Sequence, residues 1–135
     1  MIDVLIDTNL LIYAMDKTSI HHERASHILL DPDHNLYTTT KNISEFFAVS
    51  SKLGIAHQRS VDFYEDLKTH AIILFPLEKS LIIFEDLINQ YLPKGNRVYD
   101  IEIVSIMLAN DIETVATLNL KDFININEIQ ILNNS

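Results

Sequence analysis

Short apolar runs alternate along the chain with stretches in which hydrophobic residues recur at helical spacing. The runs are rich in Val, Ile and Leu, which is typical of strands buried on both faces of a parallel sheet. We expect strands at Val4–Ile6, Leu36–Thr39, Ile72–Phe75, Val115–Thr117 and Ile129–Leu132. We expect helices at Asn9–Met15, His22–Leu30, Asn42–Leu53, His57–His70, Ser80–Tyr91 and Asp100–Ala109. This alternation predicts an α/β fold, with about five parallel strands flanked by helices on both faces.

The composition is that of a folded domain. Hydrophobic residues make up 47% of the 135 residues, which is enough for a buried core, and the 2 Gly and 3 Pro argue against disorder. We therefore expect residues 1–135 to form a single domain. The chain has no cysteine, which excludes disulfides, zinc–thiolate sites and cysteine nucleophiles.

The first apolar run does not have the pattern of a secretion signal. Asp3 and Asp7 interrupt it, and no basic residues precede it. No other apolar run approaches the length of a membrane span. We expect a cytoplasmic protein that makes no use of a membrane.

The overall charge argues against strong non-specific binding of nucleic acid. The chain has 10 Lys and Arg against 19 Asp and Glu, a net charge of −9. Binding to phosphates requires cations, so an acidic chain is a poor general partner for RNA or DNA. A bound divalent metal would reverse the local sign, because the ion is then the largest charge in its site.

Four acidic residues stand at junctions between the predicted elements. Asp7 follows the first strand, Glu45 lies one turn into the helix after the second, Asp100 begins the last helix, and Asp122 lies in the turn after the fourth strand. The carboxyl ends of neighbouring parallel strands meet at one crevice, so we expect these side chains to converge. Clustered carboxylates repel one another, and Mg²⁺ or Mn²⁺ would remove that repulsion.

Each acid also has an ordinary structural explanation, which the sequence leaves open. Asp7 suits a helix N-cap, and Asn42 with Glu45 fits the spacing of a capping box with Asn42 at the N-cap. Asp100 suits the first turn of a helix, and Asp122 suits a solvated turn. Only their expected co-location favours a shared site.

Four segments around these acids carry a family resemblance. They are Ile6-Asp7-Thr8-Asn9, Ile43-Ser44-Glu45-Phe46-Phe47, Tyr99-Asp100-Ile101-Glu102 and Thr117-Leu118-Asn119-Leu120-Lys121-Asp122-Phe123. In this order and spacing the chain resembles the PIN-domain family of metal-dependent ribonucleases, and most closely its small VapC-type toxins of toxin–antitoxin pairs. The resemblance implies a three-layer α/β/α Rossmann-like fold.

The resemblance also implies an activity: cleavage of RNA phosphodiester bonds with Mg²⁺ or Mn²⁺. The ions would be held by Asp7, Glu45 and Asp100, with a fourth acid near Thr117. The resemblance to VapC-type toxins further implies an RNA substrate, a cognate antitoxin and a homodimer. Long apolar-faced helices at Ser80–Tyr91 and Asn42–Leu53 favour the homodimer independently.

The chain departs from the family pattern after the fourth strand. The family often places Asp two residues after Thr117, and here Asn119 stands there, which offers a neutral oxygen ligand. We expect Asp122 to supply the missing carboxylate, directly or through water. The expected catalytic residues are Asp7, Glu45, Asp100 and Asp122, and the expected metal ligands are these four with Asn119.

Cations and aromatic residues near these segments have ordinary explanations. Lys41, Arg97 and Lys121 flank the expected site, and solvated surface is the default for such residues. The pairs Phe46–Phe47 and Phe63–Tyr64 are expected in the core or in a dimer interface.

Two other functions compete with the nuclease. The first is a degenerate PIN domain that binds RNA or a protein partner without cleavage, which Asn119 and the acidic surface favour. The second is a phosphotransferase of the haloacid-dehalogenase type, which needs an Asp two residues after the first. Asn9 occupies that position, which argues against it.

Overall fold

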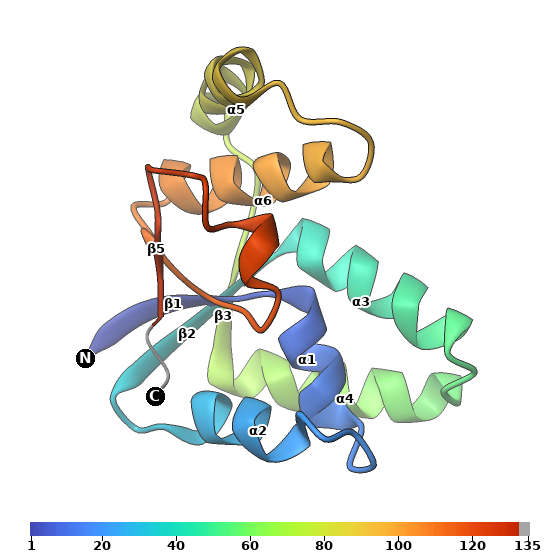
Figure 1. Cartoon of the computed structure of the whole chain (residues 1–135). Coiled ribbons are helices and arrows are strands. Elements are labelled where there is room, and N and C mark those ends of the chain that lie inside the picture. Colours follow the sequence, from blue (N-terminus) through green and yellow to red (C-terminus); the bar gives the residue numbers. More distant parts are fainter. Residues whose placement is uncertain (133–135) are drawn as a thin grey trace.

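A parallel sheet runs through the middle of the computed structural model, which describes residues 1–132 (Figure 1). The five strands lie in the order β3-β2-β1-β4-β5, and every pair is parallel. Their bounds are β1 (Ile2–Ile6), β2 (His34–Thr39), β3 (Ala71–Leu74), β4 (Thr114–Ala116) and β5 (Gln130–Ile131). The α/β fold class with about five parallel strands is thereby confirmed.

Helices cover both faces of this sheet. They are α1 (Thr8–Met15), α2 (His22–Leu30), α3 (Thr40–Lys52), α4 (His57–His70), α5 (Glu78–Tyr91) and α6 (Arg97–Ala109), with a short 3₁₀ helix η1 (Leu120–Asp122). Helices α1 to α4 contribute to one hydrophobic cluster, whereas α5 and α6 contribute to the other. The result is the expected three-layer α/β/α arrangement.

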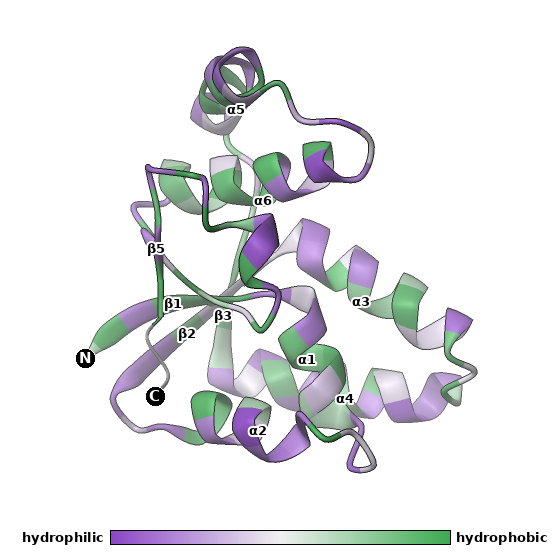
Figure 2. Cartoon of the chain, viewed as in Figure 1, coloured by the Kyte–Doolittle hydropathy of each residue, from purple (hydrophilic) through white to green (hydrophobic). Residues whose placement is uncertain are grey.

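Strand β1 shows why the layers form. Val4 and Ile6 belong to the first cluster and Leu5, between them, to the second; all three are fully buried. Successive side chains of a strand point to opposite faces, so an uninterrupted apolar run requires a helix layer on each side. In Figure 2 the hydrophobic colour is concentrated on β1, α1 and α6, close to this strand.

Two of the predicted helix starts that differ from the structure, those of α3 and α6, lie beside the expected site. Helix α3 begins at Thr40, directly after β2, with Thr39 as its N-cap, so Asn42 is not the cap. Helix α6 begins at Arg97 rather than at Asp100 and thus follows Gly95 and Asn96 directly. Asp100 therefore stands within the first turn of α6.

No helix among residues 1–132 combines the length and the apolar character needed to cross a bilayer.

Candidate active site

Asp7 is fixed at the carboxyl end of the central strand. It caps α1, and its side chain is only 6% exposed. One carboxylate oxygen accepts a hydrogen bond from the Thr8 backbone N–H at 2.8 Å, and the other accepts from the Thr117 hydroxyl at 2.9 Å. Both oxygens are thus oriented by neighbours, and β1 places them at the edge where β2 and β4 also end.

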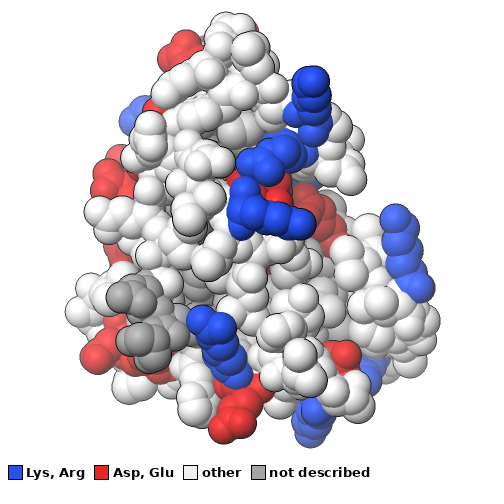
Figure 3. Space-filling model, viewed as in Figure 1, with Lys and Arg blue, Asp and Glu red and all other residues white. Residues whose placement is uncertain are grey.

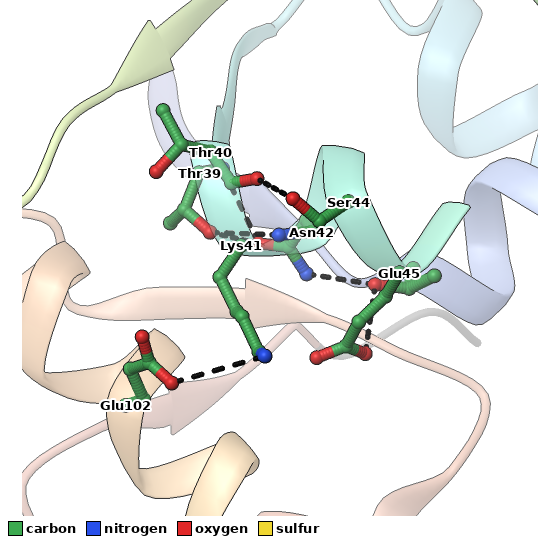
Figure 4. A network of polar contacts seen from close by, with 8 residues as sticks. Thr39, Thr40, Lys41, Asn42, Ser44, Glu45 and Glu102 are labelled. Carbon is green, nitrogen blue, oxygen red and sulfur yellow. Dashed lines mark hydrogen bonds and ion pairs between the residues drawn. The ribbon is translucent and has the colours of Figure 1, made fainter. Parts of the chain in front are cut away.

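The entry into α3 is held by a capping box of Thr39 and Asn42 rather than the expected Asn42 and Glu45. The Thr39 hydroxyl accepts from the Asn42 backbone N–H at 3.1 Å, and Asn42 Oδ1 accepts from the Thr39 backbone N–H at 3.2 Å. Asn42 is fully buried and donates from Nδ2 to the Thr8 hydroxyl at 3.0 Å (Figure 4). This network ties α3 to α1 and leaves Glu45 without a capping role.

Glu45 lies one turn into α3 and reaches toward Thr8. Its Oε2 accepts a hydrogen bond from the Thr8 hydroxyl at 3.5 Å, a long contact. Its Oε1 is buried and has no hydrogen-bond partner among residues 1–132. A buried carboxylate oxygen without a partner is costly, so this oxygen is available to a cation.

Asp100 and Asp122 approach from the other side of the sheet's edge. Asp100 comes from the first turn of α6, and Asp122 ends η1. Asn119 Nδ2 donates to Asp122 Oδ2 at 2.8 Å, and the Asn119 backbone N–H donates to the Thr117 hydroxyl at 2.9 Å. The loop after β4 is therefore linked through Thr117 to Asp7.

All four carboxylates line one cavity of about 370 Å³. Its other lining residues are Thr8, Asn9, Ala48, Val49, Lys52, Asn96, Arg97 and Tyr99. Asn119 is not among them, and it is linked to the site through its hydrogen bonds to Asp122 and Thr117. Lys121 does not line the cavity either, although its carbonyl accepts from Arg97 at 3.4 Å.

Burial and repulsion between carboxylates raise the pKa of Asp7, Glu45 and Asp100. Burial raises the pKa of Asp7 to about 6, against the hydrogen bonds from Thr117 and Thr8, which lower it. Burial also raises the pKa of Asp100 to about 7, and the charges of Asp122, Asp7 and Glu45 add to this effect. The pKa of Glu45 is raised by burial, while the Lys41 ammonium acts in the opposite direction.

These features fit a hard divalent cation. The donors are carboxylate oxygens, one of them buried and unpartnered, and their raised pKa values report negative charge that lacks compensation. Within residues 1–132, no group of three or more Asp, Glu or His side chains is placed so that it could hold a metal ion by itself. An open arrangement suits Mg²⁺, which usually keeps several waters and binds one or two carboxylates directly.

The sequence did not indicate several of these residues. Lys52, Asn96 and Tyr99 line the cavity, and Asn42 supports it from below. Lys52 is the last residue of α3, and one face of this helix was already expected at the site. Helical spacing from Glu45 could therefore have indicated that Lys52 lies on that face. Tyr99 directly precedes Asp100, and nothing in the sequence indicated that Tyr99 would be exposed.

A family model for the PIN domain matches residues 4–129. The chain belongs to the PIN domain family. This confirms the resemblance on which the fold and the acidic segments were interpreted. Comparison with curated proteins finds no match.

Solved structures agree with this PIN fold. A chain of VapBC-1 from nontypeable Haemophilus influenzae is 25% identical, with a TM-score of 0.71 over 98% of both chains. A chain of VapBC2 from Rickettsia felis, bound to a DNA fragment from its promoter, is 19% identical, with a TM-score of 0.73 over 98% of both chains. VapC20 from Mycobacterium tuberculosis is 13% identical, with a TM-score of 0.68 over 83% of this chain and 86% of that one.

Proposed function

We propose that this PIN domain is a metal-dependent endoribonuclease, with Asp7, Glu45 and Asp100 as the main ligands of Mg²⁺ or Mn²⁺. The observation that carries the proposal is the convergence of four carboxylates on one cavity, two of them with a pKa raised to about 6 and about 7. Such a cluster is unfavourable by itself and becomes favourable around a cation. Asp122 stands beside them as a direct or water-mediated ligand.

The residues of the chain divide the work of an in-line displacement at phosphorus. When bound, Mg²⁺ or Mn²⁺ would act as a Lewis acid on the phosphodiester and neutralise its developing charge. Thr8 and Thr117 keep the Asp7 carboxylate in one orientation by their hydrogen bonds. Asn42 holds Thr8, and through it α1 and α3, at the distance that brings Glu45 to the same cavity.

The activity is tested by cleavage of RNA. We expect cleavage of single-stranded RNA with Mn²⁺ or Mg²⁺ and none with EDTA. The preparation control is Asp7→Asn purified in the same way, because a contaminating nuclease would survive that substitution. Metal-dependent cleavage that is equal in both proteins would contradict the assignment.

The non-cleaving PIN domain is the second candidate. Asn119 favours it, because an amide occupies a position that the family often gives to an acid and is bonded to Asp122. It predicts RNA binding without products at any concentration of Mn²⁺. The cleavage assay therefore decides between the two.

We further propose that the chain is the toxin of a toxin–antitoxin pair and acts in the cytoplasm. The similar chains come from VapBC assemblies, and VapC20 is described as a toxin that cleaves the sarcin–ricin loop. Growth arrest on expression, relieved by co-expression of the product of an adjacent reading frame, is the test. Unchanged growth with a soluble, folded product would contradict it.

A homodimer is proposed on the apolar surface of α5 and the segment before it. Phe75, Leu77, Leu81 and Ile82 are 62%, 46%, 61% and 58% exposed. The other helix named for this role, α3, has its aromatic side chains packed against α4, with Phe46 and Phe63 rings 5.5 Å apart. We expect the mass of a dimer at micromolar concentration, and of a monomer for Leu81→Glu. Ile20→Glu, which also changes an exposed residue, is the matched control and should remain dimeric.

A further inference from the structure

We infer that Tyr99 is a stacking platform for an unpaired base next to the phosphate that is cleaved, and that Lys52 and Arg97 receive the flanking phosphates. The inference rests on the proposed RNA cleavage and extends it to the form of RNA that the site accepts. It follows from three features of the cavity mouth: an exposed aromatic ring, the cation beneath that ring, and unpaired cations at the rim.

Tyr99 is the only aromatic side chain among the described residues that line the cavity. It directly precedes Asp100, and 47% of it is exposed. The other aromatic residues near the site serve a different purpose: Phe46, Phe63 and their neighbours pack on one another in the core. An exposed aromatic ring beside a phosphodiester site offers a surface on which a base of any type can stack.

Lys41 holds the Tyr99 ring in place. Its ammonium lies 4.0 Å from the ring centroid and 4.0 Å from a Glu102 carboxylate oxygen. Figure 4 shows the Lys41 side chain extending from the start of α3 toward Glu102 on α6. A cation against an aromatic ring is attracted to it, so this contact fixes the ring between two helices that both contribute to the cavity.

Two cations at the cavity lie outside the ion pairs of the described residues, although the Arg97 guanidinium lowers the pKa of Asp100 and donates to the Lys121 carbonyl at 3.4 Å. Neither Lys52 nor Arg97 takes part in an ion pair among residues 1–132. They come from different elements, the end of α3 and the start of α6. Figure 3 shows Lys and Arg side chains bordering a recess in which acidic side chains are visible.

This arrangement resolves the conflict between an acidic protein and an anionic substrate. With a net charge of −9, the surface as a whole repels RNA. Cations at the rim attract the phosphates on either side of the cavity, while the carboxylates within it are left for a metal. The sequence assigned Arg97 to ordinary solvated surface, and the structure places this exposed residue in the lining of the cavity.

A base can stack on Tyr99 only when it is free of its own helix. A loop or single strand provides such a base at little cost, whereas a duplex must first be opened. We therefore expect the site to select RNA with an unpaired base next to the cut, with little preference for which base it is.

The test uses a short single-stranded oligoribonucleotide that contains 2-aminopurine, whose fluorescence is quenched on stacking. Binding is measured with Ca²⁺ and again with EDTA, so that it does not depend on cleavage. We expect quenching with the unsubstituted chain and with Tyr99→Phe, which keeps the ring. Tyr99→Leu should lose the quenching and bind roughly ten- to a hundredfold more weakly.

The cations are tested in the same assay by the dependence of affinity on salt. Lys52→Gln and Arg97→Gln should each reduce the slope of log affinity against log salt by about 0.7, the value for one single-strand phosphate contact. Lys17→Gln, which removes an exposed cation from the segment between α1 and α2, is the matched control and should leave the slope unchanged.

Three results would overturn the inference. They are full quenching and affinity in Tyr99→Leu, a duplex that binds as tightly as the single strand, and an unsubstituted chain that binds no RNA in either buffer. Absence of cleavage with Mn²⁺, accompanied by quenching that depends on Tyr99, would contradict the nuclease and leave the stacking site standing.

Discussion

The two halves of the site are built in opposite ways. Asp7 and Glu45 come from β1 and α3, where a buried network of Thr8, Asn42 and Thr117 orients them. Asp100 and Asp122 come from α6 and η1. Among residues 1–132, the one side-chain hydrogen bond to either carboxylate is donated by Asn119 to Asp122. The first half is preorganised by the fold, whereas the second half presents charge with little to compensate it.

The pKa values express this difference. For Asp7, burial is opposed by two hydrogen bonds to its carboxylate, and the pKa is raised to about 6. For Asp100, burial is reinforced by three neighbouring carboxylates, which the Arg97 guanidinium offsets only in part, and the pKa is raised to about 7. Preorganised donors stabilise a charged ligand in advance, so the second half should depend more strongly on the ion itself.

The largest effect should come from removing one charge from each half. Asp7→Asn and Asp100→Asn should each lower metal-dependent cleavage by more than about a hundredfold, which exceeds the loss from groups that only support a ligand. Their stabilities should differ: without metal, Asp100→Asn should melt higher than the unsubstituted chain because it relieves repulsion. Asp7→Asn should gain less, because it weakens the hydrogen bonds from Thr8 and Thr117.

The measurement is cleavage at saturating Mn²⁺ together with thermal melting in EDTA. Cleavage close to that of the unsubstituted chain in either variant would remove that residue from the site. Equal melting shifts in the two variants would remove the distinction between the halves.

Glu45 and Asn42 separate charge from support within the preorganised half. Glu45→Gln should lower cleavage about tenfold or more with little change in melting temperature, because Thr39 and Asn42 form the cap. Asn42→Ala should lower the free energy of unfolding by about 1–2 kcal/mol, since it removes the cap bond and leaves buried polar groups unpaired.

Circular dichroism melts and cleavage rates of both variants make this comparison. If Glu45→Gln melts as low as Asn42→Ala, Glu45 has a structural role after all. If it cleaves normally, Glu45 is not a ligand.

The sequence predicted the preorganised half better than the other half, for physical reasons. Asp7 follows an apolar run that can only be a central strand, so its position at the sheet's edge is determined by β1 alone. Asp100 and Asp122 depend on where α6 and η1 begin, and the start of α6 was predicted at the wrong residue. Contacts between elements, such as Lys41 with Tyr99 or Asn119 with Asp122, have no local pattern and required the fold.

Even in the better half, the local pattern misled in one detail. Asn42 and Glu45 have the spacing of a capping box, but β2 runs into α3 without a loop, and Thr39 takes the N-cap. Asn42 still belongs to a capping box, at its N3 position rather than at its N-cap. The spacing rule was correct and its register was wrong.

The pH dependence should reveal the half that lacks compensation. Because the folded protein holds the Asp100 proton to a pKa of about 7, it binds more protons than the unfolded chain between about pH 4 and 7. Without metal, the free energy of unfolding should therefore fall as pH rises through this window and level off above it. Asp100→Asn should flatten this slope.

The Mg²⁺ concentration required for cleavage should also fall as pH rises. Protons compete with the ion for the carboxylates, so the Mg²⁺ concentration for half-maximal cleavage should rise severalfold for each pH unit below about 7. Melts in EDTA and metal titrations from pH 5 to 8 measure both trends. A metal-free stability that rises with pH over this range would contradict the raised pKa.

The smallest effect should come from Asn119, which acts on the site through Asp122. Asp122→Asn should raise the Mg²⁺ requirement, since it removes a carboxylate from the cavity. Asn119→Ala should raise it only a fewfold, by releasing Asp122 from its 2.8 Å hydrogen bond. In the double variant, loss of Asn119 should then add nothing to loss of Asp122, because the two residues form one unit. Additive effects would instead mean that Asn119 meets the metal itself through its amide oxygen. Metal titrations of the four proteins in this cycle decide whether the second half has one ligand here or two.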